Sequence, residues 1–245
     1  MDWRLALLSV IILLAYMVGA TTGFGGAMIA VALAIHLYSV EFLVPILVIL
    51  NLAISIYIVA RHHDGIESGK LFRFMLPLAA LGLPIGILIF SVAKTNTLNL
   101  VLGVFIVCFS LFELAILLGP WKDREREPMS ALQSSFWLFL GGVMHGMYAS
   151  GGPLVVYYAS RNIGEKRAFR STLSALWLML NTGLLIVYLC IGKVTADTVW
   201  ASAILLPSLA AGIALGELLH DRLPERGFRI LVFAVLLLAG ISVFL

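Results

Sequence analysis

Two glycine-rich stretches interrupt apolar segments of the chain and carry groups that could bind an anion. They read "ATTGFGGAMIAVA" at residues 20–32 and "GMYASGGPLVVYY" at residues 146–158. Glycine allows positive φ and close approach of the backbone to a ligand, and a proline such as Pro153 suits the start of a helix. A helix that begins just after the glycines of each stretch, near Ala27 and at Pro153, would present unpaired N–H donors and about half a positive charge at its N-terminus. The two stretches therefore predict a pair of half-helix N-termini that hold an anion.

The polar residues and glycines around these stretches form the predicted substrate site. Hydroxyl, imidazole and amide groups are neutral hydrogen-bond donors for a small oxyanion, and no Lys or Arg lies clearly inside an apolar segment. We expect such a site to hold its anion weakly enough for release. The alternative is that the asparagines and the histidine only bond to neighbouring helices. The predicted substrate-binding residues are Thr21, Thr22, Gly23, Gly25, Gly26, Asn51, His145, Tyr148, Ser150, Gly151, Gly152 and Asn181.

Three ionisable residues are candidates for coupling to a proton or a sodium ion. Glu113 and Glu217 are the acidic residues within apolar segments, and His145 precedes the second stretch. An ionisable group inside a membrane is a functional candidate by default. For Glu217 the alternative is snorkelling, because it lies near the end of its segment, and Glu113 has no counterpart in the second half of the chain.

The composition is that of an integral membrane protein. Hydrophobic residues make up 62% of the chain and charged residues 12%, with a mean hydropathy of +1.07. Soluble domains carry roughly 45–50% apolar and about 25% charged residues. Runs of about 20 apolar residues favour helical crossings over a barrel. The net charge of +3 is typical of basic cytoplasmic loops and gives no reason to expect a nucleic-acid partner.

The chain is predicted to be an internal repeat. A shift of 130 residues superposes four special positions, and a shift of 126 superposes Gly25–Gly26 on Gly151–Gly152. We therefore expect a first transmembrane repeat at 1–119, a cytoplasmic linker at 120–130 and a second transmembrane repeat at 131–245. The expected apolar segments are 3–19, 27–38, 42–60, 72–92 and 97–119, then 132–147, 153–160, 171–190, 198–219 and 226–245. The four superposed pairs are Asn51/Asn181, Pro77/Pro207, Gly82/Gly212 and Gly86/Gly216, of which the two glycine sets are read as helix-packing residues.

Basic residues predict the topology. All Lys and Arg except Arg4, Lys94 and Lys193 fall in segment 61–73, the linker 120–130, segment 161–170 and segment 220–229. The positive-inside rule places these four segments in the cytoplasm. The chain between the linker and segment 161–170 must then enter the membrane and return to the same side. The predicted fold is an all-α integral membrane protein of two inverted-topology repeats, each a re-entrant or broken helical hairpin plus three transmembrane helices. Both chain ends are expected outside.

The paired motifs "GATTGFGGAMIAVAL" and "GGVMHGMYASGGPLVVYY" carry a family resemblance. With the chain length, the duplicated layout and the basic linker, they resemble the TauE/SafE sulfite exporter family over essentially the whole chain. Ala27 and Ala149 depart from the family pattern, which usually has Gly at both positions. The resemblance implies export of sulfite or an organosulfonate by a multi-pass protein of the bacterial inner membrane.

The predicted function is that of a secondary transporter with alternating access, and not of an enzyme. One alternative is an anion channel of the same fold. The other is an intramembrane serine hydrolase with Ser150 as the nucleophile, because "YASG" resembles G-x-S-G, although Tyr148 replaces the leading Gly. No cofactor or metal is expected. The expected partners are a small anion, the lipid bilayer and a coupling proton or sodium ion. The identity of the anion, the direction of transport and a homodimeric state stay open.

Overall fold

The protein is all-helical in the part of the chain that the computed structural model describes, residues 3–119, 129–220 and 225–244. The all-α prediction is thereby confirmed, whereas most of the predicted linker 120–130 lies outside the described residues. The first half contains α1 (Trp3–Thr22), α2 (Gly26–Ala34), α3 (Val40–His62), α4 (Ser68–Lys70), α5 (Leu76–Val92) and α6 (Thr95–Leu118). The second half contains α7 (Ala131–Tyr148), α8 (Gly152–Asn162), α9 (Lys166–Cys190), α10 (Ala196–His220) and α11 (Glu225–Ser242).

Six helical segments are long and apolar enough to cross a membrane by length and composition. They are Trp3–Thr21, Val40–Gly65, Ser68–Val92, Thr95–Leu118, Lys166–Cys190 and Ala196–Leu219. A helix rises 1.5 Å per residue, so about 20 residues match the roughly 30 Å hydrocarbon core. Large apolar side chains cover the outer faces of these helices; Leu81, Leu118 and Trp200, for example, are each more than 60% exposed. An apolar outer surface of this kind is suited to lipid.

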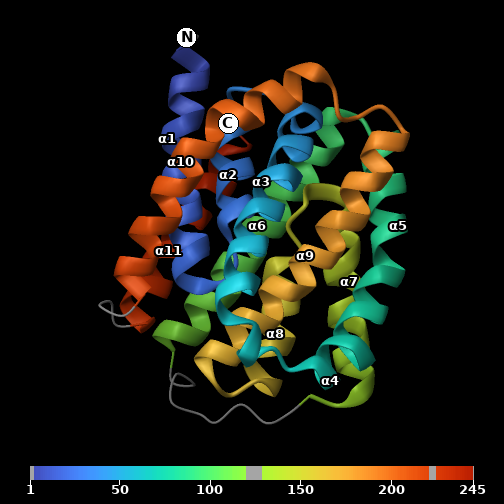
Figure 1. Ribbon diagram of the computed structural model, residues 1–245, viewed down its shortest axis with the longest axis vertical. Coiled ribbons are helices and arrows are strands. Elements are labelled where there is room, and N and C mark those ends of the chain that lie inside the picture. The colour runs from blue at the N-terminus through green and yellow to red at the C-terminus, as the bar shows by residue number, and fades with distance from the viewer. Residues whose placement is uncertain (1–2, 120–128, 221–224, 245) are drawn as a thin grey trace.

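Each half begins with a helix that stops and a shorter helix that turns back along it (Figure 1). In the second half the turn is visible in two side-chain contacts. The rings of Trp137 on α7 and Tyr157 on α8 lie 5.1 Å apart, and Gly141 on α7 faces Val155 on α8. In the first half, Gly26 at the start of α2 packs against Gly19 of α1. Both hairpins that the sequence predicts are therefore present.

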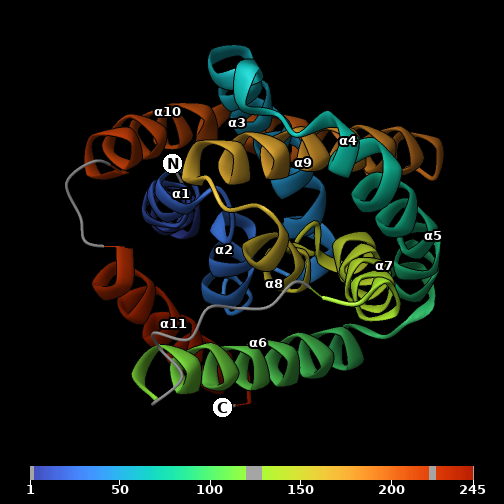
Figure 2. The same cartoon turned by 90° about the horizontal axis from the view of Figure 1, so that it is seen from below.

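The two halves of the chain pack against each other through reciprocal pairs of helices. α1 packs against α10 and α5 packs against α7, so each hairpin lies against a long helix of the other half. The remaining large contacts join α3 to α9 and α6 to α11. Viewed from below, the two hairpins lie between a layer that contains α3 and α9 and a layer that contains α6 and α11 (Figure 2). This reciprocal pairing is what a two-fold relation between the halves would produce.

Glycines let the backbones of α5 and α7, and of α10 and α1, approach closely. A methyl group added to Gly82 or Gly86 of α5 would overlap the backbone of α7, and one added to Gly212 or Gly216 of α10 would contact the backbone of α1. These are the two glycine pairs that the sequence assigned to packing, and small residues at this spacing let membrane helices approach closely.

Two of the basic segments meet at one end of the bundle, which we call the basic end. Asp64 after α3 pairs with Arg167 of α9 at 3.6 Å. Lys70 Nζ donates a hydrogen bond to the carbonyl oxygen of Asn162 at 2.5 Å. Segments 61–73 and 161–170 thus lie on the same side, as the distribution of basic residues predicted. In Figure 1 this end, with α4 and α8, lies at the bottom, and the N-terminal label lies at the top.

Candidate functional site

The first break lies between α1 and α2 and is made by glycine conformations. Gly23 has φ 81° and Gly25 has φ 86°, values that side chains other than glycine rarely adopt. The Gly23 N–H donates to the carbonyl oxygen of Gly19 at 2.8 Å, which closes α1. α2 then starts at Gly26, one residue before the position that the sequence suggested. α2 is almost entirely buried, and non-helical backbone at membrane depth is tolerated where protein surrounds it.

The second break lies between α7 and α8 and is held by side chains. Ala149 has φ 51° and is the one described residue other than glycine with a positive φ. Its N–H donates to the carbonyl oxygen of His145 at 2.8 Å. The Gly151 N–H donates to His145 Nδ1 at 3.3 Å. α8 begins at Gly152, directly before Pro153. The His145 ring therefore fixes the backbone at the point where the helix stops.

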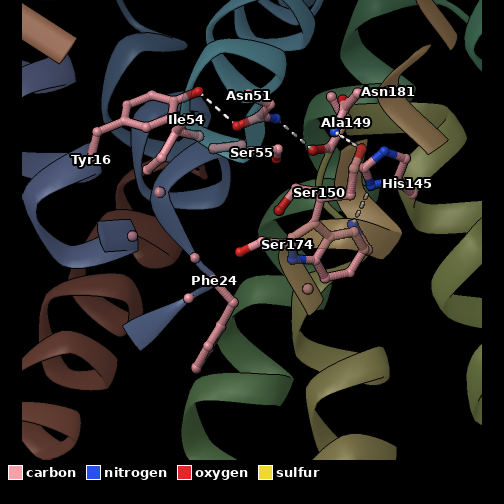
Figure 3. Close-up of a pocket in the computed structure, with 18 of the residues that line it drawn as sticks. Tyr16, Phe24, Asn51, Ile54, Ser55, His145, Ala149, Ser150, Ser174 and Asn181 are labelled. Carbon is pink, nitrogen blue, oxygen red and sulfur yellow. Dashed lines mark hydrogen bonds between the residues drawn. The ribbon is translucent and has the colours of Figure 1, made fainter. Parts of the chain in front are cut away.

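The two breaks meet at a single cavity of about 50 Å³ (Figure 3). A methyl group on Gly152 would lie 3.7 Å from the Phe24 Cβ and 3.8 Å from the Gly25 backbone nitrogen, so the tips are in van der Waals range. A water molecule needs roughly 10–15 Å³ on a comparable measure, and the cavity can hold a few waters or a small anion. Its lining includes Tyr16, Gly25, Asn51, Ser55, His145, Ser150, Gly152, Ser174, Trp177 and Asn181.

Asn51 of α3 joins both hairpins across this cavity. The Tyr16 hydroxyl on α1 donates to Asn51 Oδ1 at 2.8 Å. Asn51 Nδ2 donates to the Ala149 carbonyl oxygen at 3.1 Å. One amide thus satisfies a group from each half, and the bonds are visible in Figure 3. This arrangement gives Asn51 a definite structural role beside any contact with a ligand.

His145 and Asn181 each supply a buried polar atom without a well-formed hydrogen bond to another described residue. His145 is 1% exposed and stacks on Trp177 with the rings 5.3 Å apart. Because Nδ1 accepts from the Gly151 N–H, the neutral imidazole carries its proton on Nε2 and can donate there. The two side chains are close enough to interact, but neither His145 Nε2 nor Asn181 Oδ1 makes a hydrogen bond of normal geometry among the described residues. Buried polar atoms of this kind are normally paired, so a ligand or water can complete them.

Most of the predicted substrate-binding residues line the cavity. The ones that do are Gly23, Gly25, Gly26, Asn51, His145, Ser150, Gly151, Gly152 and Asn181. Thr21 and Tyr148 are turned elsewhere. The Thr21 hydroxyl bonds to the Met17 carbonyl at 2.8 Å and to the Gly216 carbonyl at 3.2 Å. The Tyr148 hydroxyl donates to the Leu98 carbonyl at 2.7 Å. The side chain of Thr22 lies outside the described part of the structure.

The three coupling candidates occupy different places. His145 lines the cavity. Glu113 is buried on α6 and is not part of the cavity wall. Glu217 on α10 pairs with Arg170 on α9. Within the described residues, no hydrogen bond joins Ser150 to His145, whose Nδ1 is occupied by Gly151. That geometry lacks the nucleophile–base contact that a serine hydrolase requires.

Sequence reasoning missed the polar stripe of α9. Arg170, Ser174, Trp177 and Asn181 are spaced at i, i+4, i+7 and i+11, which places them on one face of a helix. Arg170 had been counted as part of a loop, whereas α9 begins at Lys166. The signal was the helical spacing from Asn181 back towards the basic segment. On α3 the same spacing places Ser55 and Ile58 below Asn51.

Among the described residues, no group of three or more His, Cys, Asp or Glu side chains could hold a metal ion. The family model described as Sulfite exporter TauE/SafE matches residues 8–243. No curated protein and no solved structure matches the chain.

Proposed function

Since the chain belongs to the TauE/SafE sulfite exporter family, we propose that it is a secondary transporter that exports a small sulfur-containing anion. Sulfite and organosulfonates are the substrates that we favour, and the bacterial inner membrane is the location that we propose. The protein is multi-pass, with six helices suited to cross a membrane. Substrate and mechanism are proposals that rest on the cavity.

The observation that carries the proposal is that both helix breaks line one small cavity. Gly25 and Gly26 at the start of α2 and Gly151 and Gly152 at the start of α8 all contribute to its wall. Helix N-termini offer partial positive charge and N–H donors to an anion. Two such termini on one cavity give a site for a small oxyanion without a fully charged side chain in its lining.

Neutral donors complete the site. His145 Nε2 is a buried donor without a partner among the described residues, and the hydroxyl groups of Ser55, Ser150 and Ser174 lie in the cavity wall. A sulfite or sulfonate group has three oxygen atoms that accept hydrogen bonds, which suits several donors of this kind. Such a site binds less tightly than a cluster of lysines or arginines would, and a transporter must release its substrate.

We propose alternating access between two inverted repeats as the mechanism. The packing of α1 against α10 and of α5 against α7 supports this. Because each hairpin contacts a long helix of the other half, movement of the hairpin would move that helix as well. The inverted orientation is testable by labelling. After replacement of Cys108 and Cys190, single cysteines at Asp64 and Lys193 should react from opposite faces of the membrane. Reaction of both from one face would contradict the inverted repeat.

The function is tested by flux in proteoliposomes. Sulfite, sulfate, short organosulfonates and small carboxylates would each be offered under an imposed proton or sodium gradient. We expect saturable movement of sulfite or a sulfonate that depends on one gradient. Flux that is not saturable and follows only the gradient of the anion itself would indicate a channel. Absence of flux for every anion would refute the proposal.

A further inference from the structure

An ion pair with a buried arginine lies next to the cavity on the side of the basic end. It joins Arg170 of α9 to Glu217 of α10. Arg170 is 5% exposed as a residue, whereas 30% of the Glu217 side chain is exposed. A guanidinium group at such a depth carries a high desolvation cost unless its charge and its N–H donors are used. The position therefore needs a reason beyond packing.

Arg170 touches the first break. A methyl group on Gly23, which lines the cavity, would lie 3.1 Å from the Arg170 Cγ and 3.3 Å from its Cα. Ser174, one helical turn further along α9, is itself in the cavity wall. Arg170 thus lies directly below the cavity, on the face of α9 that carries Ser174 and Asn181.

The guanidinium group is not fully satisfied. One of its terminal nitrogens donates to Glu217, but Arg170 Nε is buried and has no hydrogen-bond partner among the described residues. Among the described residues, His62 of α3 interacts electrostatically with both Arg170 and Glu217, and also with the exposed Arg61 and Arg167. Glu217 is the carboxylate paired with this guanidinium group, so an arriving anion would compete with it.

The pair occurs in one half of the chain. In the register that superposes Asn51 on Asn181, the counterpart of Arg170 is Val40 and that of Glu217 is Ile87. A brace required by the shared architecture would be expected in both halves. The ion pair is present at the basic end and has no counterpart in the first half, which indicates a role on one side of the transport path.

We propose that Arg170 is the residue that recognises the anion between the basic end and the cavity, and that Glu217 holds this guanidinium until an anion displaces it. The proposal rests on the proposed transport function and names a further binding group for it. Guanidinium groups bind planar or trigonal oxyanions through two parallel N–H donors. The anion would bind the Nε side of Arg170 first and then pass Gly23 into the cavity. Glu217 acts as an exchangeable counter-ion that keeps the empty site neutral.

The test measures the half-saturating sulfite concentration, both for flux in proteoliposomes and for binding to purified protein by calorimetry. Arg170→Gln should raise it by about tenfold or more, and Glu217→Gln should lower it by several-fold, because a competing carboxylate is removed. Arg167→Gln is the matched control, since Arg167 lies one turn earlier on α9 with its side chain 54% exposed. We expect the Arg167 variant to match the wild type.

A purely structural brace predicts a different pattern. Both single variants would then lose thermal stability in detergent and lose flux alike, and the exchange of Arg170→Glu with Glu217→Arg would restore both. That result, or unchanged sulfite affinity in Arg170→Gln, would overturn the inference. Arg170→Lys keeps the charge and loses the paired donors, and should lie between wild type and Arg170→Gln. Sulfite binding that depends on Arg170 without any flux would refute the transport function and leave the binding residue standing.

Discussion

The two helix breaks perform the same task by different means. At the first break the chain turns because Gly23 and Gly25 adopt positive φ. At the second, Ala149 adopts a positive φ of 51° while His145 and Asn51 bond to the backbone around it. One turn is set by the conformational freedom of glycine, and the other is set by side chains that hold a less favourable conformation in place.

This difference indicates that the two breaks contribute different groups to the site. The second break contributes fixed polar groups, because the His145 ring is locked between the Gly151 N–H and Trp177. The first break contributes glycine backbone that lies against a charged side chain, Arg170. We therefore expect the second break to be sensitive to changes in volume and the first to be sensitive to changes in backbone conformation.

Gly151→Ala should have the largest effect on stability. Its φ of −81° suits any residue, but the added methyl group would overlap the Gly141 carbonyl oxygen and lie 3.0 Å from the His145 Cβ. Overpacking typically costs about 1–3 kcal/mol, and we expect the upper end of this range here because the added methyl group meets backbone. Thermal unfolding in detergent measures it. Gly183→Ala is the control, because its methyl group would meet only the Leu83 Cδ2 at 3.9 Å. Equal unfolding temperatures for the two variants would show that the second break has room to adjust.

Asn51→Ala should have an intermediate effect that reaches both breaks. It leaves the Tyr16 hydroxyl and the Ala149 carbonyl without their amide partner, at a cost of about 2 kcal/mol. Asn181→Ala is the matched variant, since the hydrogen bond from Asn181 Nδ2 goes to the Trp177 carbonyl of its own helix. We expect the lower unfolding temperature for the Asn51 variant. The reverse order would mean that the bridge between the halves is not a main source of stability.

Gly25→Ala should have the smallest effect. There is open space around its Cβ position, so the cost is that of a left-handed conformation, about 1 kcal/mol. Gly25→Asn should cost less, because asparagine tolerates this conformation better. Ala149→Gly provides the comparison at the second break and should be close to neutral, since the strain relieved offsets the added freedom of the unfolded chain. A loss at Gly25 as large as that at Gly151 would contradict the distinction between the breaks.

Much of the fold was predictable because its signals are local. Apolar length determines the helices. The predicted segment 42–60 corresponds to α3 (Val40–His62), and the predicted segment 171–190 corresponds to α9, which begins about one turn earlier at Lys166. Basic residues on both sides of residues 131–160 predicted that this segment turns back, and the ring contact between Trp137 of α7 and Tyr157 of α8 agrees with a helix that returns along its predecessor. The positions of glycine and proline predicted the starts of α2 and α8 to within one residue.

The parts of the site that escaped prediction depend on contacts between distant segments. Tyr16 lines the cavity and its hydroxyl donates to Asn51, 35 residues later. No local sequence pattern predicts that bond. Arg170 was assigned to a loop because charge normally marks the end of a membrane helix, and here the helix continues through it. Tyr148 was assigned to the site by its position in the motif, yet its hydroxyl turns away to Leu98.

The most direct test of the central claim, that the two breaks form one anion site, is sulfite flux through Gly152→Val and Gly152→Ala in proteoliposomes. The methyl group of alanine would only touch Phe24 and the Gly25 nitrogen at ordinary contact distance, whereas valine would fill the space between the tips. We predict near-normal flux for the alanine variant and a loss of at least about tenfold for the valine variant, with both proteins folded by thermal unfolding. Wild-type flux through a folded Gly152→Val protein would contradict the claim.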